Sequence, residues 1–409
     1  MRDNVPVKRA LPEPGPLAGL WDLDPGVVFL NHGSFGATPR SVLAEQGRIR
    51  ALLESDPVAF FERRYQPLLD AARAALADFV GARPEDLVFV ANATTGVNTV
   101  LRSLELRPGD QLLVTDHEYN ACRNALEAVA APAGAVVEVV RLPFPLQSPD
   151  EILDRVLERV TARTRLLLID HVTSQTALVM PLESLVREVQ GCGVDVLVDG
   201  AHAPGMLELD LTALGAAYYT GNCHKWMCAP KGAGFLVVRE DLRSTVRPLV
   251  ISHGANAPVG ERSRHHLEHD WTGTRDPSAW LSVPASLETL GAMVDGGWPE
   301  VRRRNHELAL EGRRTLAAAL GSDLPCPDAM VGSMASLPLP DARGDRRTAD
   351  GERDPVQEAL YRDWAIQVPV IPWPAPGQRL LRLSAQLYNS REQMAYLREA
   401  LLEVLSKHS

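Results

Sequence analysis

Short apolar runs alternate with amphipathic stretches over the first two thirds of the chain. Eight runs have the length of a strand: residues 27–31, 86–92, 110–118, 135–142, 165–172, 195–202, 216–221 and 232–239. Stretches such as residues 68–82, 149–164 and 181–193 repeat their apolar positions at helical spacing. Apolar runs separated by helices predict a mainly parallel sheet that is covered on both faces.

The pattern changes after about residue 290. A long helical pattern covers residues 298–320, two strand candidates and a charged loop at residues 341–354 follow, and a helical pattern at residues 391–405 comes last. We therefore predict an α/β fold in three parts. They are an N-terminal arm (residues 1–22), a large domain (residues 23–290) and a smaller C-terminal α+β domain (residues 291–409).

Composition and charge exclude several classes of protein. The 409 residues carry a net charge of −10, which argues against a nucleic-acid surface. No window has the roughly 20 apolar residues of a membrane span, and the first twenty residues contain four prolines where a signal peptide is apolar, so we expect a cytoplasmic protein. The five cysteines are never spaced as CxxC, and the segment HHLEH (residues 265–269) lacks HExxH, so we expect no metal.

Polar residues directly follow five of the predicted strands. They begin at Asn92, Asp116, Asp170, Asp199 and Asn222. In an open parallel sheet, ligands bind beyond the carboxyl ends of the strands. Core packing alone does not explain polar or ionisable groups at five such strand ends, so we predict one site that all five build.

The residue types at these ends indicate a phosphorylated cofactor. Thr94 and Thr95 open a helix whose free N–H groups could hold a phosphate, although either threonine could instead be an ordinary N-cap. The chain lacks GxGxxG after a strand and GxxxxGK[ST], so a dinucleotide or nucleotide site is not supported. Asp199 could pair with a protonated ring nitrogen, and Lys225 could supply the amine of a Schiff base. Together these groups indicate pyridoxal 5′-phosphate (PLP).

The motifs resemble the class V branch of the fold-type I PLP-dependent enzymes, which includes cysteine desulfurases, kynureninase and isopenicillin N epimerase. The motifs that carry the resemblance are ATTG, DHEYN, DGAHAPG, TGNCHKW, GTRDP and RLSAQLYNS, in this order. The resemblance runs from FLNHGSFG to the last helix, and NHGSFGATP, NATTGVN and DHVTSQTALVMP are most similar to the isopenicillin N epimerase group. It implies a fold-type I architecture, with a mainly parallel seven-stranded sheet and flanking helices in the large domain.

The resemblance also implies roles for individual residues around the cofactor. Lys225 would form the Schiff base and Asp199 would pair with the pyridine nitrogen. His202 would lie near the phenolic oxygen, which the loop with His171 and Ser174 would also approach. The phosphate would be held by Thr94, Thr95, Asn222 and His224, and by Thr274 from the neighbouring subunit of a homodimer.

Other roles concern the substrate, which the resemblance implies to be a small molecule: an amino acid or an amino-acid conjugate. Arg382 would bind the α-carboxylate, since its planar fork matches a carboxylate. The entrance would be lined by Asn31, His32 and Ser34. The aromatic ring that stacks on the cofactor is either His117 or Tyr119, and the same two residues are the candidates for a second acid–base group.

These motifs favour an epimerase that acts at the Cα of an amino acid in secondary metabolism. A C–S (β-eliminating) lyase or a decarboxylation-dependent oxidative deaminase remains an alternative, as in antibiotic tailoring. Desulfurase chemistry is argued against, because it needs a cysteine shortly before Arg382 and none follows Cys326. The motifs of this chain match kynureninase less well than they match the isopenicillin N epimerase group. A non-catalytic binding protein would have no need to combine Lys225, Asp199 and Arg382.

Overall fold

A seven-stranded sheet forms the centre of the molecule, as the sequence predicted. The computed structural model describes residues 10–341, 353–375 and 377–408. Within them the strand order is β2-β8-β7-β6-β5-β3-β4, and the five strands from β7 to β4 run parallel. Strand β8 is antiparallel to both of its neighbours. The strands are β2 (Leu87–Val90), β3 (Gln111–Thr115), β4 (Val136–Val140), β5 (Thr164–Asp170), β6 (Asp195–Gly200), β7 (Tyr218–Asn222) and β8 (Gly234–Val238).

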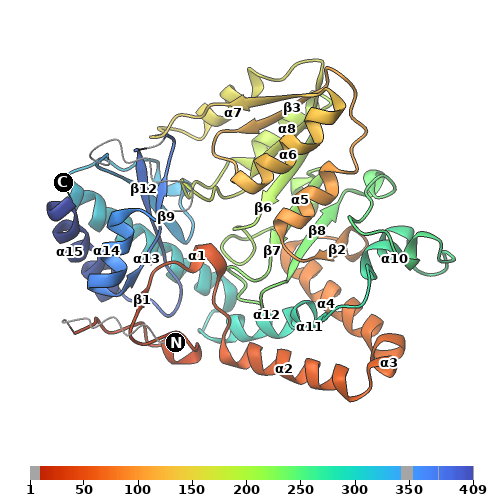
Figure 1. The fold of residues 1–409 in the computed structure, drawn as a ribbon, viewed down its shortest axis with the longest axis horizontal. Coiled ribbons are helices and arrows are strands. Elements are labelled where there is room, and N and C mark those ends of the chain that lie inside the picture. The colour runs from red at the N-terminus through yellow and green to blue at the C-terminus, as the bar shows by residue number, and fades with distance from the viewer. Residues whose placement is uncertain (1–9, 342–352, 376, 409) are drawn as a thin grey trace.

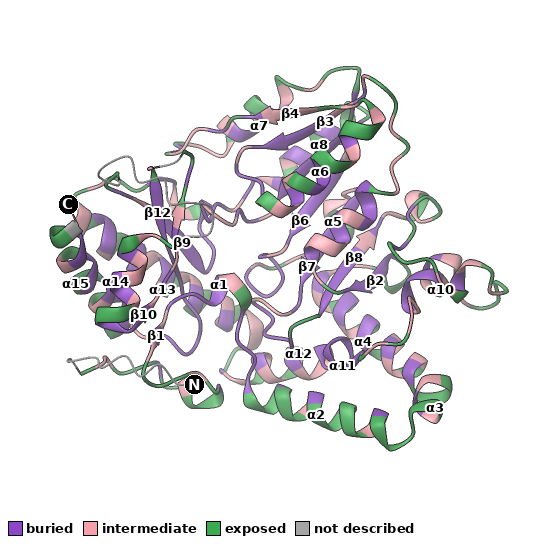
Figure 2. Ribbon diagram, viewed as in Figure 1, coloured by how far each residue is buried: buried purple, intermediate pink, exposed green. Residues whose placement is uncertain are grey.

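Helices cover both faces of this sheet. Alternate residues of the strands face opposite ways: Val88, Leu112 and Leu166 join one apolar cluster, whereas Phe89 and Leu167 join the other. Except for the edge strand β4, the strands are therefore almost wholly buried (Figure 2). The first cluster includes α5 (Ala93–Leu101) and α6 (Asn120–Ala133), and the second includes α4 (Tyr65–Val80), α7 (Asp150–Leu157) and α8 (Leu182–Gly191).

The C-terminal part is a separate α+β layer, on the left of Figure 1. Its sheet has three antiparallel strands in the order β11-β12-β9, one more than the sequence predicted. Its elements are β9 (Met334–Leu339), β11 (Val370–Pro372), β12 (Arg379–Ser384), α13 (Gly297–Leu320), α14 (Pro355–Trp364) and α15 (Arg391–His408). Most of the charged loop at residues 341–354 lies outside the described residues. The domain boundaries after residues 22 and 290 stay predictions.

The first apolar run, at residues 27–31, does not join the large sheet. It forms β1 (Val28–Phe29), which pairs in parallel with β10 (Ile366–Gln367). The backbone of Leu30 then bonds to Gln367 and Ser384. The prediction failed because the pattern of a short buried run does not specify its partner strand. This pairing places α1 (His32–Phe35) between the two parts of the molecule (Figure 1).

The remaining elements surround these layers. They are α2 (Arg40–Ser55), α3 (Pro57–Ala59), α9 (Leu211–Leu214), α10 (Arg264–Asp270), α11 (Ser278–Leu281), α12 (Val283–Ala292) and the short helices η1 (Ala18–Leu20), η2 (Phe60–Arg64), η3 (Pro84–Asp86), η4 (Glu240–Leu242), η5 (His253–Ala255) and η6 (Asp328–Met330). None of the helices in the described ranges combines the length and the hydropathy that crossing a bilayer requires.

Candidate active site

Lys225 lies in the turn after β7, and its side chain is enclosed by the protein. Its Nζ is 3.0 Å from Nε2 of His202, which follows β6. The indole of Trp226 donates to Nδ1 of the same imidazole at 3.4 Å. Since Nδ1 accepts, the proton of the neutral imidazole is on Nε2, where it can be donated to the lone pair of a neutral amine. His202 and Lys225 therefore form a pair in which neither group needs to be charged.

The electrostatic environment favours this neutral pair. Burial, helped by the charge of Arg382, lowers the pKa of Lys225 to about 8, and the nearby Asp199 and Asp170 partly oppose the shift. Burial and the charge of Lys225 also hold the pKa of His202 well below its usual value. A substantial fraction of Lys225 is thus an unprotonated, nucleophilic amine near neutral pH.

Asp199 closes strand β6 and is almost completely buried. Its Oδ1 accepts the backbone N–H of Ala201 at 2.9 Å, and its Oδ2 accepts the thiol proton of Cys122 at 3.0 Å. Two donors thus hold this carboxylate in one orientation. A buried carboxylate on the same sheet edge as Lys225 is the arrangement that a protonated ring nitrogen requires.

The start of α5 supplies the phosphate end of the site. Asn92, and not Thr94 or Thr95, is the N-cap, since its Oδ1 accepts the Thr95 N–H at 2.8 Å. Asn222 Oδ1 accepts the Ala93 N–H, also at 2.8 Å. These bonds show that the alternative interpretation of the two threonines as caps was wrong. Both threonines are half-buried in the first turn of the helix, where the macrodipole favours an anion.

Glycine is required where α5 meets β7. A Cβ on Gly96 would lie 2.1 Å from Oγ1 of Thr220, a distance that no real contact reaches. The close approach brings the α5 terminus beside the turn that carries His224 and Lys225. Nδ1 of His224 lies 2.9 Å from the carbonyl of Ala233, which fixes the imidazole at the same end of the site.

His117 and Tyr119 differ in their surroundings. His117 is fully buried, with Nδ1 2.8 Å from Oγ1 of Thr176 and its ring edge-on to Trp373 at 4.6 Å. Its Nε2 is buried and has no hydrogen-bond partner. Tyr119 is 45% exposed and precedes the first turn of α6. Of the two rings, only the imidazole of His117 is therefore buried with an unpartnered nitrogen.

Arg382, on β12, is buried and held by neutral oxygens. Nη1 donates to the carbonyl and the hydroxyl of Ser174, at 2.6 and 3.2 Å. Nη2 donates to Oγ of Ser34 at 3.0 Å and to Oδ1 of Asn31 at 3.5 Å, while Nε is buried without a partner. Burial lowers the pKa of Arg382 to about 10. No carboxylate compensates this guanidinium within the described residues, so the fork suits an anionic ligand.

Two histidines lie elsewhere than predicted. His32 does not line an entrance: it is fully buried, with Nδ1 2.8 Å from the Tyr388 hydroxyl and Nε2 2.9 Å from the Lys225 carbonyl. His171 does not approach the cofactor site, because side chains alternate along β5 and its neighbour Asp170 takes the inner face. Nδ1 of His171 bonds to the Tyr219 hydroxyl at 2.9 Å, and the ring borders a groove between α8 and α9.

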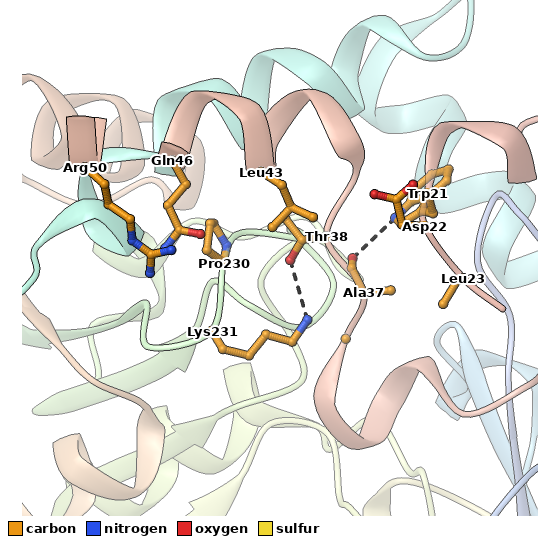
Figure 3. Close-up of a pocket in the computed structure, with 11 residues that line it drawn as sticks. Trp21, Asp22, Leu23, Ala37, Thr38, Leu43, Gln46, Arg50, Pro230 and Lys231 are labelled. Carbon is orange, nitrogen blue, oxygen red and sulfur yellow. Dashed lines mark hydrogen bonds between the residues drawn. The ribbon is translucent and has the colours of Figure 1, made fainter. Parts of the chain in front are cut away.

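Lys231 is separated from this site. It borders a pocket beside α2, together with Trp21, Gln46 and Arg50, and its Nζ donates to Oγ1 of Thr38 at 3.5 Å (Figure 3). Of the two lysines in the segment after β7, only Lys225 therefore lies with Asp199 and His202. Thr274 is exposed in the segment between α10 and α11.

Sequence reasoning gave no role to four residues of the site: Cys122, Glu118, Asp170 and Trp373. Glu118 and Asp170 lie in two of the polar segments that the sequence did place at the strand ends, but neither residue was assigned a function there. Cys122 carried no such signal, since a lone thiol in a helical pattern is usually core packing. Trp373 comes from the C-terminal part, and only the tertiary structure brings it to His117.

Known proteins resemble this chain over most of its length. A family model described as aminotransferase class V matches residues 57–339. The isopenicillin N epimerase of Amycolatopsis lactamdurans is 38% identical, over 93% of this chain and 96% of the relative. A probable chloroplastic L-cysteine desulfhydrase of Arabidopsis thaliana is 34% identical, over 92% and 83%.

Solved structures share the fold at lower identity. The cysteine desulfurase CsdA from Escherichia coli superimposes with a TM-score of 0.77 at 21% identity, over 96% of this chain and 98% of that one. A complex of the cystine C–S lyase C-DES with cysteine persulfide gives a TM-score of 0.76 at 22% identity, over 92% and 97%.

Proposed function

This chain belongs to the class V aminotransferase family, and from this premise we propose that it is an amino-acid epimerase in secondary metabolism, similar to the isopenicillin N epimerases. It is a PLP-dependent enzyme. The residues present fit PLP: an amine at Lys225, an ordered carboxylate at Asp199 and the start of a helix at Ala93. When bound, PLP accepts the electrons of a bond that breaks at Cα.

The observation that carries the proposal is the buried Lys225, whose pKa is lowered to about 8 by burial and by the charge of Arg382 while Asp199 opposes the shift. Arg382 would hold the α-carboxylate of an amino acid through its free Nε and one Nη, which orients the Cα–H bond. Lys225 Nζ would then take the Cα proton, because a neutral amine with a pKa of about 8 is both available and basic enough. The enclosure of Lys225 and His202 keeps water from this proton.

Epimerisation requires a second group on the opposite face of Cα. We assign this role to Tyr119 and the stacking role to His117. His117 is the buried ring of the two, and burial lowers its pKa to about 4, so it is a poor proton donor at neutral pH. Tyr119 is close enough to Arg382 that its charge would raise the arginine pKa, which supports a position beside the substrate.

The test is incubation of the holoenzyme with candidate L-amino acids and their conjugates in deuterium oxide. Deuterium at Cα with inverted configuration supports the epimerase. Retention of both the configuration and the Cα proton for every substrate that changes the absorbance of the bound cofactor would contradict it. A Tyr119→Phe variant should still exchange Cα–H for deuterium while losing inversion.

A C–S lyase is the second candidate, and the desulfhydrase relatives favour it. In that case the same incubation releases a thiol or sulfide, ammonia and a keto acid, which has no stereocentre at Cα. Carbon dioxide, ammonia and an aldehyde, formed with consumption of oxygen as the oxidant, would instead indicate decarboxylation-dependent oxidative deamination. Persulfide chemistry is not proposed, because the last cysteine, Cys326, is buried and accepts a hydrogen bond from Arg313.

We also propose a homodimer in which Thr274 completes the phosphate site of the neighbouring subunit. The exposure of Thr274 beyond α10 supports this role. A mixture of Lys225→Ala and Thr274→Ala subunits tests it. The heterodimer has one site with Lys225 and with an intact Thr274 from its partner, so PLP affinity at that site should return to the wild-type value. No recovery would place Thr274 in its own chain's site or outside any site.

A further inference from the structure

A cluster of acidic groups and a thiol lies behind Asp199. It consists of Glu118, Cys122, Asp170 and Asp199, which come from the loop after β3, the first turn of α6 and the ends of β5 and β6. The polar atoms of Glu118, Cys122 and Asp199 lie within 4.8 Å of one another, and all four residues are at most 5% exposed. We refer to these four residues as the acid cluster. The three buried carboxyl groups form no salt bridge among the described residues. Because buried negative charges are costly without a cation, their total negative charge must be reduced in another way.

Cys122 is a permanent hydrogen-bond donor in this cluster. Its thiol donates to Oδ2 of Asp199 at 3.0 Å. Burial and the neighbouring acids raise the pKa of the thiol far above its usual range, so it keeps its proton at every relevant pH. The carboxylate of Asp199 is consequently bound on both oxygens, by the S–H group and by the N–H of Ala201.

Glu118 and Asp170 form a pair that holds a proton. Burial raises the pKa of both carboxyls well above their usual values. The charge of Glu118 raises the pKa of Asp170 further, whereas the hydrogen bond between the two carboxyls partly offsets the shift of Glu118. Their outer oxygens, Oε2 and Oδ2, are buried and have no partner. Asp199 also disfavours their ionisation, whereas Arg123 and Lys225 favour it weakly. Two adjacent carboxyls in such a site cannot both ionise.

We propose that Cys122, Glu118 and Asp170 are positioning residues for Asp199, the acid that would pair with the PLP ring nitrogen: the thiol fixes the orientation of the Asp199 carboxylate, and the proton shared by Glu118 and Asp170 limits the negative charge packed against it. Asp199 is the acid of the cluster with donors on both oxygens. The inference rests on PLP dependence and not on the reaction that the enzyme performs.

The experiment measures the dissociation constant of PLP and the pH titration of the cofactor's visible absorbance, without substrate. Cys122→Ala removes the donor and should weaken PLP binding about tenfold. Cys122→Ser keeps a donor and should stay within about threefold of the wild type. A thiol that only packed would give the opposite order, because a serine hydroxyl costs more than an alanine methyl in an apolar site.

Cys326→Ala and Cys326→Ser serve as the matched pair, since Cys326 is another buried thiol and neither change should alter PLP affinity. Equal PLP affinities of Cys122→Ala and the wild type, or weaker binding by Cys122→Ser than by Cys122→Ala, would overturn the role of the thiol. Because no substrate is present, failure of the proposed epimerase reaction would leave these results unaffected.

Glu118→Gln tests the shared proton independently. The amide keeps the shape of a protonated carboxyl and leaves Asp170 as the single charge of the pair. PLP affinity at neutral pH should therefore remain within about threefold of the wild type, whereas Glu118→Ala, which leaves Asp170 without its partner, should weaken it more. If both carboxyls of the pair were ionised, the amide would remove a charge that Asp170 does not replace, and a tenfold or larger loss of PLP affinity with Glu118→Gln would overturn the pair.

Discussion

The two ends of the site carry opposite charges and are built in different ways. The acidic end, with Asp199 at its centre, consists of groups that follow neighbouring strands of one parallel sheet. The cationic end is Arg382, which the neutral oxygens of Asn31, Ser34 and Ser174 hold from two other segments of the chain. Carboxylates without a cation and a guanidinium without an anion are each costly to bury. The difference indicates that each end is completed by a different ligand group: a ring cation at Asp199 and a substrate carboxylate at Arg382.

Lys225 lies between these ends and responds to both. Arg382 lowers its pKa, and Asp199 and Asp170 raise it. A substitution at either end should therefore change the pKa of Lys225 as well as the binding of the ligand group at that end.

The largest effect should come from replacing Lys225, the amine whose pKa depends on both ends. Lys225→Ala loses the covalent attachment of PLP and the base at Cα, so turnover should fall by at least about 10³-fold. Spectrophotometry should show that the absorbance of the lysine-bound cofactor is gone. Lys231→Ala, which changes the lysine of the pocket in Figure 3, should stay within about threefold of the wild type. Turnover by Lys225→Ala at the wild-type rate would refute the assignment.

Removing Arg382 alone should distinguish substrate binding from PLP binding. Arg382→Ala leaves a substrate carboxylate without its partner, which typically costs about 2–5 kcal/mol, so kcat/KM should fall by about 30- to 5,000-fold. PLP affinity should fall much less, because Asp199, Cys122 and α5 are untouched and only the pKa of Lys225 changes. Arg382→Lys should recover only part of the loss, because an ammonium group cannot form the two parallel bonds. Equal losses of PLP affinity and of kcat/KM would show that the two ends are not separate.

The charge of Arg382 should also be visible in the titration of Lys225. In the protein without PLP, the rate of PLP attachment should rise with pH around a midpoint of about 8, where the amine loses its proton. Arg382→Ala removes a like charge and should move that midpoint upward, toward the usual lysine value. The folded pKa is lower than the unfolded one, so the cost of burying the ammonium is fully present below about pH 8. Stability should therefore increase as the pH rises from about 8 toward 10.5.

The smallest effect should come from removing the Ser34 hydroxyl, which accepts a hydrogen bond from the Arg382 guanidinium. Ser34→Ala removes one bond to Nη2 of Arg382, a contribution of about 1 kcal/mol, so KM for the amino acid should rise about 2- to 10-fold with kcat nearly unchanged. Steady-state kinetics measure both constants. A fall in kcat with constant KM would instead place Ser34 in the chemical step.

Much of the large sheet and its catalytic edge could be predicted. Apolar runs between helices specify parallel strands, and polar residues at the carboxyl ends of such strands must converge, which located Asp199, His202 and Lys225 near one another. Family resemblance supplied Arg382. The same pattern misplaced residues 27–31 and His171, because an apolar run does not name its partner strand, and a residue after a strand can lie on either face.

The sequence by itself therefore determined the order of strands and helices, the family of enzymes and the lysine that can carry PLP, since these depend on local periodicity and on residue type. The tertiary structure alone decided what each charged group meets. It brought the Cys122 thiol to Asp199, gave Glu118 a second acid as its neighbour, and joined β1 to the C-terminal part so that Asn31 and Ser34 reach Arg382. These contacts join residues from distant segments, and only packing sets the distances and the dielectric environment that fix their charges.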